Sequence, residues 1–483
     1  MNDRAHEEAS NDGLPGPWPA LLVLAVVQLM IVLDNSILNM ALASAQADLA
    51  FSAADRHWPI SIYALSFGSL LLLGGRLSDR LGRRRALMIG LGGFAVASGL
   101  AGASVNFGML IGARATQGVF AAIMAPALLS MVTVLFPSGS ARLRAFGVIG
   151  LVATSGAGVG LLLGGFLTEF LNWRWTMFVN VIFAVGAATG AAVLIRPDSV
   201  GPPRKVDVIG AALVLLGTAA LVLGLGRAES RPWLSPDVLG AVICGPVLLA
   251  GFLAWQRVAP SPLLPLQILR SRTRGAAYLS RFVASVGNFA LIFFMAFVLQ
   301  EVFRFSPLQT GLAITPLVLG YVLASTLLAT RIASRLRYRS IVFCGLLLGA
   351  MSLALLSLMD PATSYWSGMV GPLVVFGLGQ GLTTATSMNA GIDGVRIEDR
   401  GVASATVNLM QQLGAAVGTA ALSSVAVMVT SSYLTERPGA EAEATTHGVA
   451  IALLVTSQLF LLSAVICPLM AGPSPARLDP ITV

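Results

Sequence analysis

The sequence predicts an all-α integral membrane protein with fourteen transmembrane helices. Of its 483 residues, 56% are hydrophobic and only 11% are charged. Apolar stretches long enough to cross a hydrocarbon core of about 30 Å recur along almost the whole chain, and no sizeable soluble domain is left over. The expected spans are 19–42, 57–75, 86–104, 108–136, 143–168, 173–195, 207–227, 236–256, 275–303, 308–330, 340–359, 364–391, 400–432 and 447–471.

Basic residues gather on one side of this topology. Of the 30 Lys and Arg residues, 22 fall in the tails and in loops that share one face, and six fall on the opposite face. The positive-inside rule therefore predicts that both termini are cytoplasmic, in a cell membrane that the chain crosses many times. The net charge of +8 reports this orientation, because the basic residues are dispersed beside lipid and form no patch that could dock a nucleic acid.

An internal repeat divides the chain. Residues 76–81 recur 255 positions later as residues 331–336, and the pair Gln117-Gly118 has a counterpart in Gln380-Gly381. Spans one to six thus correspond to spans nine to fourteen, as in transporters built from duplicated bundles. The expected parts are a tail 1–18, a six-helix bundle 19–195, a linker 196–274 with inserted helices seven and eight, a second bundle 275–471 and a tail 472–483.

A dense charged turn, residues 75–84, lies between the second and third spans. Its glycines permit a tight reversal, and its one aspartate is free to pair with a neighbouring element when the protein changes state. A plain basic stop-transfer loop is the alternative. The residues assigned to a conformational latch are Gly75, Asp79, Arg80, Gly82, Arg83 and Arg84.

This turn resembles the loop between helices 2 and 3 of the major facilitator superfamily, departing from its pattern only at Ser78. The whole layout is similar to the fourteen-helix drug:proton antiporter family of that superfamily, whose fold is two six-helix bundles plus an inserted pair. The resemblance implies alternating access, with Asp79 facing the cytoplasmic start of the helix that begins near Arg400. Further motifs that carry it are residues 33–42, 173–180, 207–210, 306–311 and 400–404.

Asp34 is the only acidic side chain well inside the apolar part of an expected span. A carboxylate in hydrocarbon is costly unless it is paired, hydrated or protonated, so a proton-coupling role is favoured over a permanent structural salt bridge. Arg114 is the expected partner, since its helix 4 motif resembles one that is linked to proton transfer in the family. At about 1.5 Å per residue, both side chains fall at nearly the same depth in the outer half of the membrane.

Helix 1 also carries an amide stripe formed by Gln28, Asn35 and Asn39, about 100° away from Asp34 around the helix. We expect the stripe to line a substrate cavity, although ordinary hydrogen bonding between helices explains these amides equally well. Two further amides are assigned to the same cavity. These are Gln117 and its repeat counterpart Gln380.

Glycines in the fifth span match the spacing of the antiporter motif. The members of this helix-packing motif are Gly147, Gly156, Gly160, Gly164 and Gly165. Three of them lie on one face and would let another helix approach closely, as small-xxx-small faces do. Leu161 stands where the family motif has a proline, so the kink that proline favours is not encoded, and generic glycine packing remains the alternative.

Two more charged residues are expected to reach solvent rather than to act in transport. Arg281, six residues into the ninth span, is expected to snorkel to the membrane surface, with a functional role as the alternative. Glu301 at the other end of that span is expected to be solvated. The three cysteines lie singly on different helices, so neither a disulfide nor a metal site is expected.

The favoured function is proton-coupled efflux of a small hydrophobic drug, antibiotic or secondary metabolite. A proton-driven importer of a nutrient on the same fold is the alternative that Leu161 leaves open. An enzyme or sensor is not expected, because the sequence has no paired carboxylates, histidine cluster, nucleophile elbow or phosphate loop. The partners are a small-molecule substrate, protons and membrane lipid; we expect a monomer that needs no cofactor and draws on the proton gradient.

Overall fold

The structure is a computed structural model in which the described residues are 17–52, 54–136, 139–196, 207–228, 231–328, 337–395 and 400–472. Most of the two predicted tails, part of the predicted linker and the repeat segment 331–336 lie outside the described residues. Within the described part, fourteen helices are long and apolar enough to cross a membrane and no strand occurs. The predicted fold class is confirmed.

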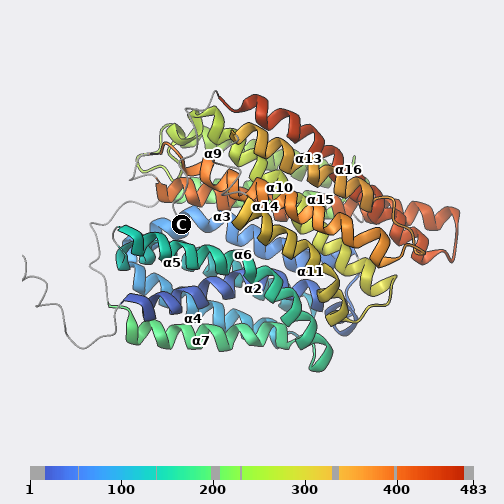
Figure 1. Ribbon diagram of the computed structural model, residues 1–483, viewed down its shortest axis with the longest axis horizontal. Helices are drawn as coiled ribbons and strands as arrows, with labels where there is room; N and C mark the ends of the chain where they lie inside the picture. The colour runs from blue at the N-terminus through green and yellow to red at the C-terminus, as the bar shows by residue number, and fades with distance from the viewer. Residues whose placement is uncertain are drawn as a thin grey trace, which may run out of the picture.

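Each predicted span overlaps one of these helices (Figure 1). In the first half they are α2 (Pro17–Leu49), α3 (Trp58–Leu81), α4 (Arg83–Gly102), α5 (Phe107–Leu135), α6 (Gly139–Phe170) and α7 (Trp175–Leu194). The inserted pair is α8 (Val208–Arg227) and α9 (Pro236–Trp255). The second half contains α10 (Arg272–Glu301), α11 (Pro307–Leu323), α13 (Tyr338–Leu356), α14 (Val370–Ile392), α15 (Arg400–Glu436) and α16 (Glu441–Met470).

Local sequence explains where several helices begin. Ser306 forms a capping box with Gln309 at the start of α11, which has Pro307 at its first position. The Asn106 side chain accepts a hydrogen bond from the Met109 backbone and so starts α5. Such caps satisfy amides that the first helical turn leaves without partners.

The helices form two six-helix groups built on the same plan. In the first group, α3 packs on α5, α4 packs on α5 and α7, and α2 packs on α6 and α7. In the second group the corresponding pairs recur: α11 on α14, α13 on α14 and α16, and α10 on α15 and α16. The repeat seen in the sequence therefore has a counterpart in the packing.

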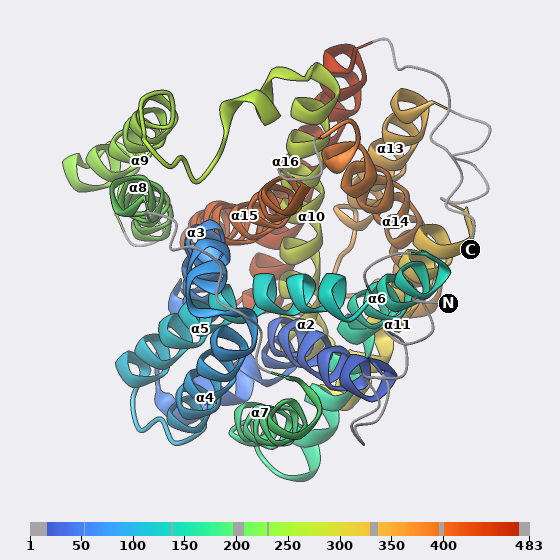
Figure 2. The ribbon, with the colours of Figure 1, turned by 90° about the vertical axis from the view of Figure 1, so that its left-hand side faces the viewer.

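Two seams join the groups, α3 against α15 and α6 against α11 (Figure 2). Glycines allow this close approach. A Cβ atom added to Gly165 would lie 2.6 Å from the Pro307 carbonyl oxygen, and one added to Gly311 would lie 2.8 Å from that of Leu161. Both contacts are with backbone, which cannot move aside as a side chain can.

The inserted helices α8 and α9 pack on each other beside the α3–α15 seam, and α8 contacts both helices of that seam (Figure 2). A hydrogen bond of 2.6 Å between the hydroxyls of Ser69 and Thr218 fixes α8 to α3. The inserted pair thus lies against both six-helix groups at once.

Asp207 organises the start of α8, just outside the span Val208–Arg227. Its carboxylate accepts hydrogen bonds from the Gly210 backbone at 2.8 Å, the Trp255 indole at 2.8 Å and the Gln256 amide at 2.7 Å. Burial raises the pKa of this carboxyl, but these hydrogen bonds outweigh burial and hold its pKa below the ordinary value. One carboxylate therefore ties together both inserted helices.

Asp207→Ala is expected to destabilise the purified protein by about 1 kcal/mol or more, because it removes a helix cap and leaves two side-chain donors without their acceptor. Thermal unfolding in detergent would measure this as a lower Tm. Since the folded pKa is depressed, the stabilisation by the carboxylate is present above an ordinary Asp pKa of about 3.9 and is lost as pH falls through the folded value. Equal Tm values for the two proteins at neutral pH would contradict the prediction.

The charged turn differs from the prediction in one respect. The structure continues α3 to Leu81, so most of this segment is helix and only Gly82 joins α3 to α4. Gly82 has φ 88°, a conformation that side chains rarely adopt, as the predicted reversal requires. Gly75 lies inside the helix with Pro126 Cβ 3.7 Å from an added Cβ atom, whereas neighbouring Gly74 lies against the Ala122 backbone. Gly74 rather than Gly75 is the close-packed glycine.

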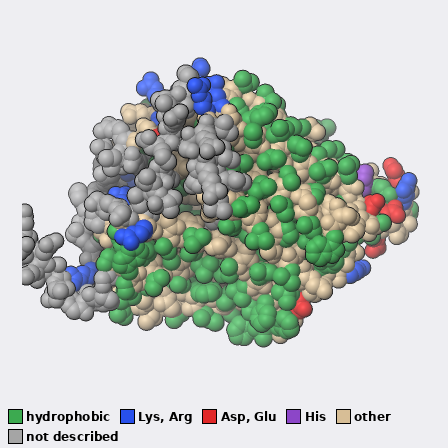
Figure 3. All heavy atoms as spheres, viewed as in Figure 1, with side chains coloured by type: hydrophobic (Ala, Val, Ile, Leu, Met, Phe, Trp, Pro, Cys, Tyr) green, Lys and Arg blue, Asp and Glu red, His purple; other side chains and the backbone are tan. Residues whose placement is uncertain are grey.

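Charge is unevenly distributed between the two ends of the molecule. In Figure 3 an apolar band separates the end at the left, which carries Lys and Arg, from the end at the right, which carries most of the Asp and Glu on this face. Helix α2 begins and α16 ends at the left-hand end (Figure 1). We call it the terminal end and the opposite one the far end.

Candidate functional site

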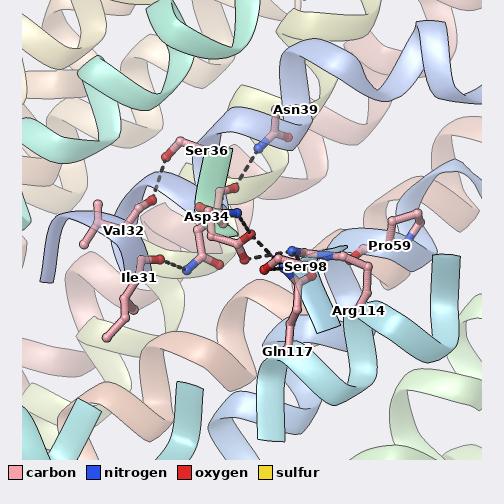
Figure 4. Close-up of polar contacts among 11 residues, drawn as sticks. Ile31, Val32, Asp34, Ser36, Asn39, Pro59, Ser98, Arg114 and Gln117 are labelled. Carbon is pink, nitrogen blue, oxygen red and sulfur yellow. Dashed lines mark hydrogen bonds and ion pairs between the residues drawn. The ribbon is translucent and has the colours of Figure 1, made fainter. Parts of the chain in front are cut away.

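Asp34 lies fully buried in α2 at the centre of a polar cluster within the first six-helix group (Figure 4). Its Oδ2 atom accepts a hydrogen bond of 2.7 Å from Nη1 of Arg114 in α5. Its Oδ1 atom accepts one of 2.7 Å from the Asn180 amide in α7 and a longer one of 3.4 Å from Gln117. Three helices therefore converge on one carboxylate.

Arg114 is held on every side. Its Nε atom donates to the Pro59 carbonyl at 3.1 Å, and Nη1 also donates to the Gln117 side-chain oxygen at 2.9 Å. The Tyr63 ring covers the guanidinium with its centroid 4.3 Å from Cζ, a cation–π contact. A buried ion pair needs such extra hydrogen bonds to offset the loss of hydration. The pairing expected from the family resemblance and supported by depth is present in the structure.

The site contains residues that the sequence analysis missed. Asn180 and Tyr63 contact the ion pair, and the Ser98 hydroxyl accepts a hydrogen bond of 2.7 Å from Gln117. Asn180 ends one of the motifs that carry the family resemblance, and it is an amide inside an apolar span, so a signal was present. Nothing local to Ser98 or Tyr63 distinguishes them from ordinary helix residues.

The prediction that Gln117 and Gln380 line a substrate cavity is wrong for this structure. Gln117 is fully buried in the Asp34 cluster, one helical turn from Arg114 on the same face of α5. Gln380 is buried inside the second group, where its amide donates to the Ala284 carbonyl at 2.6 Å. Both amides satisfy partners within their own bundle.

The amides of the α2 stripe, unlike Gln117 and Gln380, bond mainly to the backbone of their own helix. The amides of Asn35 and Asn39 donate to the backbone oxygens four residues earlier, at 3.0 and 3.1 Å. Asn39 also lines a small cavity between α2 and α10, whose lining includes Phe297 and Gln300. Gln28 is partly exposed. Asn35 also lies beside Tyr63 of the Asp34 cluster, so the stripe is not wholly separate from that cluster. Its role in substrate binding stays a prediction.

Three glycines of α6 form a continuous face against α2. A Cβ atom added to Gly156 would lie 3.3 Å from Val32, one added to Gly160 2.8 Å from Ser36, and one added to Gly164 2.5 Å from the Ile37 carbonyl. Gly165 faces α11 instead. Gly147 has no atom within 4 Å of an added Cβ, so including it among the packing glycines is wrong.

The far ends of the two groups are in contact. Arg56 pairs with Glu301 of α10 at 3.4 Å and lies over the Phe297 ring, and its Nε atom donates to Gln46. Glu301 is therefore an ion-pair partner whose side chain also stays 40% exposed to solvent. At the other seam, Glu169 of α6 accepts hydrogen bonds from the Ser306 hydroxyl and, at 3.0 Å, from the Leu308 backbone at the start of α11.

At the terminal end the predicted latch is only partly described. Asp79 is exposed and has no hydrogen bond or ion pair with any residue in the described part of the chain. Residues 396–399, directly before α15, lie outside that part. Arg84 donates to the Ala192 carbonyl at 2.7 Å, which fixes the start of α4 to the end of α7. The latch role of Asp79 stays a prediction.

Asp79→Asn is expected to slow turnover while equilibrium substrate binding stays near normal. The first amides of a helix favour an anion by about 0.3 to 1 kcal/mol, so losing the charge would change the conformational equilibrium by up to about fivefold. Transport rate and equilibrium binding should be measured on the same preparation, with Asp360→Asn, an exposed acid at the far end, as control. Lost binding with unchanged conformational exchange would place Asp79 in the binding path instead.

Comparison with known proteins agrees with this architecture. The puromycin resistance protein pur8 of Streptomyces alboniger is 39% identical over 457 residues, covering 94% of this chain and 91% of that protein. The cephamycin export protein CmcT of Amycolatopsis lactamdurans is 32% identical over 449 residues, covering 91% of each.

A solved structure shares the fold. It is a bacterial homologue of the human lysosomal transporter Spinster, in an inward-facing and unoccupied conformation, with a TM-score of 0.67 and 16% identity over 94% of this chain and 97% of that one. The family model of the Major Facilitator Superfamily matches residues 24–419. This chain is therefore a multi-pass membrane protein that belongs to the Major Facilitator Superfamily.

Proposed function

We propose that the protein exports a small hydrophobic antibiotic, drug or secondary metabolite in exchange for protons. The main support for export is the similarity of the chain, over more than nine tenths of its length, to relatives named for puromycin resistance and cephamycin export. The buried Asp34 cluster supports the coupling to protons, because it is an ionisable pair enclosed within one bundle.

The cluster offers a physical route from proton to movement. Protonation of Asp34 removes the charge that holds Arg114, and a buried guanidinium without its counter-ion is unfavourable. Rearrangement of α2, α5 and α7 would relieve this cost. Helix α2 also carries the surface that receives the glycine face of α6, and α6 forms a seam with the second group. A change at Asp34 can therefore reach the boundary between bundles through packed helices.

Alternating access requires the two ends of the molecule to open in turn. By the positive-inside rule the terminal end is cytoplasmic and the far end is extracellular. The far-end contacts of Arg56 with Glu301 and of Glu169 with α11 must break for the protein to open outward. We propose that it works as a monomer in the cytoplasmic membrane of a bacterium, without a cofactor, and that the proton gradient is its energy source.

Everted membrane vesicles that contain the protein test this function. Labelled puromycin should accumulate in vesicles with an acidic interior, and an ionophore that dissipates the pH gradient should stop accumulation. Vesicles without the protein are the control. Proton-driven uptake by intact cells, with no export from a strain that expresses the protein, would favour the nutrient importer instead. Export that persists after the ionophore would contradict proton coupling but not export.

A further inference from the structure

Arg281 is an arginine away from the helix ends in the second six-helix group. Nine residues separate it from the start of α10, which places it about 14 Å into the helix at about 1.5 Å per residue. The other arginines in the described helices of this group, Arg272, Arg274, Arg339 and Arg400, lie within the first turn of their helices. A guanidinium at membrane depth is costly unless it is paired or hydrated.

Its surroundings do not neutralise it. One Nη atom donates to the Gln411 side-chain oxygen, and the Tyr321 side chain lies beside the same group. Among the described residues no carboxylate pairs with Arg281, and its Nε atom is buried without a hydrogen-bond partner. Its contacts run to α15 and α11, which the expected snorkelling to the membrane surface does not account for.

Arg114 and Arg281 differ in the acceptors that surround them. Arg114, buried in the first group, has a carboxylate, a backbone carbonyl and an amide oxygen as acceptors. Arg281 has one amide oxygen as its hydrogen-bond acceptor in the described part. Arg114 has a carboxylate counter-ion inside the protein, whereas the partly exposed Arg281 has none among the described residues and keeps an Nε donor without an acceptor.

The contacts of Arg281 direct it toward the helices that meet the first group. Gln411 belongs to α15, which packs on α3, and Tyr321 belongs to α11, which packs on α6. These two helices form the sides of the second group that meet the first. A side chain of α10 that contacts residues of both therefore lies between the two seam helices of the second group, and α10 itself also contacts α2 of the first group.

We propose that Arg281, with Gln411 and Tyr321, binds an oxyanion, such as a carboxylate, on those transported compounds that carry one, a class that does not include puromycin. The guanidinium presents paired N–H donors that match a carboxylate, and the amide and phenol can each donate another hydrogen bond. An anionic lipid headgroup has the same chemistry, but Arg281 faces the other bundle rather than lipid. The inference rests on the proposed transport function and adds a substrate class to it.

Equilibrium binding to the full-length protein in phosphatidylcholine nanodiscs tests the site. The probes are a fluorescent diethylaminocoumarin carboxylate and its neutral methyl ester. The wild-type protein should bind the acid at least about tenfold more tightly than the ester, as expected for charge-assisted hydrogen bonds. Arg281→Gln should remove this preference without weakening ester binding. Arg272→Gln changes an exposed arginine on the same helix and should behave as wild type.

Arg281→Lys keeps the charge but not the paired donors, and should retain part of the preference, which guards against misfolding of the glutamine variant. No preference in the wild type, or equal loss for both probes in Arg281→Gln, would overturn the proposal. Loss of the wild-type preference when phosphatidylglycerol is added, with phosphatidylglycerol bound by the wild type and not by Arg281→Gln, would assign the oxyanion to lipid and overturn it too. These assays use no proton gradient, so a failure of proton-coupled export would leave their outcome intact.

Discussion

Asp34→Asn is expected to reduce gradient-driven export to background while the protein still folds and inserts. The amide has nearly the shape of the carboxyl, and its oxygen can still accept from Arg114. Its NH2 group must donate, and the Asn180 side-chain oxygen, which has no partner in the structure, is available as acceptor if that amide turns over. The variant side chain cannot take up and release a proton. Export of puromycin from everted vesicles under an imposed pH gradient measures the effect. Export at the wild-type rate in this variant would exclude Asp34 as the coupling residue.

A second measurement separates coupling from damage. If protonated Asp34 is a normal state of the cycle, the neutral amide should resemble that state, and exchange of labelled for unlabelled puromycin without a gradient should persist. The Tm should fall, because Arg114 loses its counter-ion but keeps the Pro59 carbonyl and the Gln117 side-chain oxygen. Asp360→Asn alters an exposed acid and should leave both activities unchanged. Loss of both exchange and gradient-driven export would indicate a structural role for the ion pair.

The proximity of Asp34 and Arg114 could be predicted because helical rise is nearly constant. Residues whose depths, counted from their helix ends, are equal lie at one level, and they can meet if their helices are adjacent. Gln117 was misplaced although its spacing of three from Arg114 puts both on one face of α5. Asn180 could be seen as polar but not assigned, since its partner depends on α7 packing against α2, which no local pattern encodes.

Hydropathy predicts where a span crosses the membrane, not where its helix ends. The predicted span 57–75 stops at the first arginines, yet α3 continues to Leu81, because backbone hydrogen bonding needs no apolar side chains. The same limit applies to Arg281, whose distance from the helix end suggested snorkelling. Its real environment depends on α11 and α15, which are distant in sequence.

The glycines of α6 show a further limit, since spacing alone made five residues look alike. A Cβ atom added to Gly164 would lie 2.5 Å from the Ile37 carbonyl oxygen and 3.0 Å from the Ile37 Cα atom, whereas Gly147 has open space around the same position. The two glycines lie in one helix, so alanine in either gains the same helix propensity. Any difference between the variants therefore reports contact with α2.

Gly164→Ala is expected to destabilise the protein by about 1 to 3 kcal/mol, because the obstacle is backbone and α2 must move away from α6. Gly147→Ala should be neutral or stabilising, by up to about 1 kcal/mol, since alanine favours a helix and meets no atom. Thermal unfolding in detergent compares the two, and export under a pH gradient should fall only for Gly164→Ala, since α2 carries Asp34. Equal Tm values for the two variants would show that the α2–α6 contact yields easily, and the route from Asp34 through α6 to the second group would lose its structural basis.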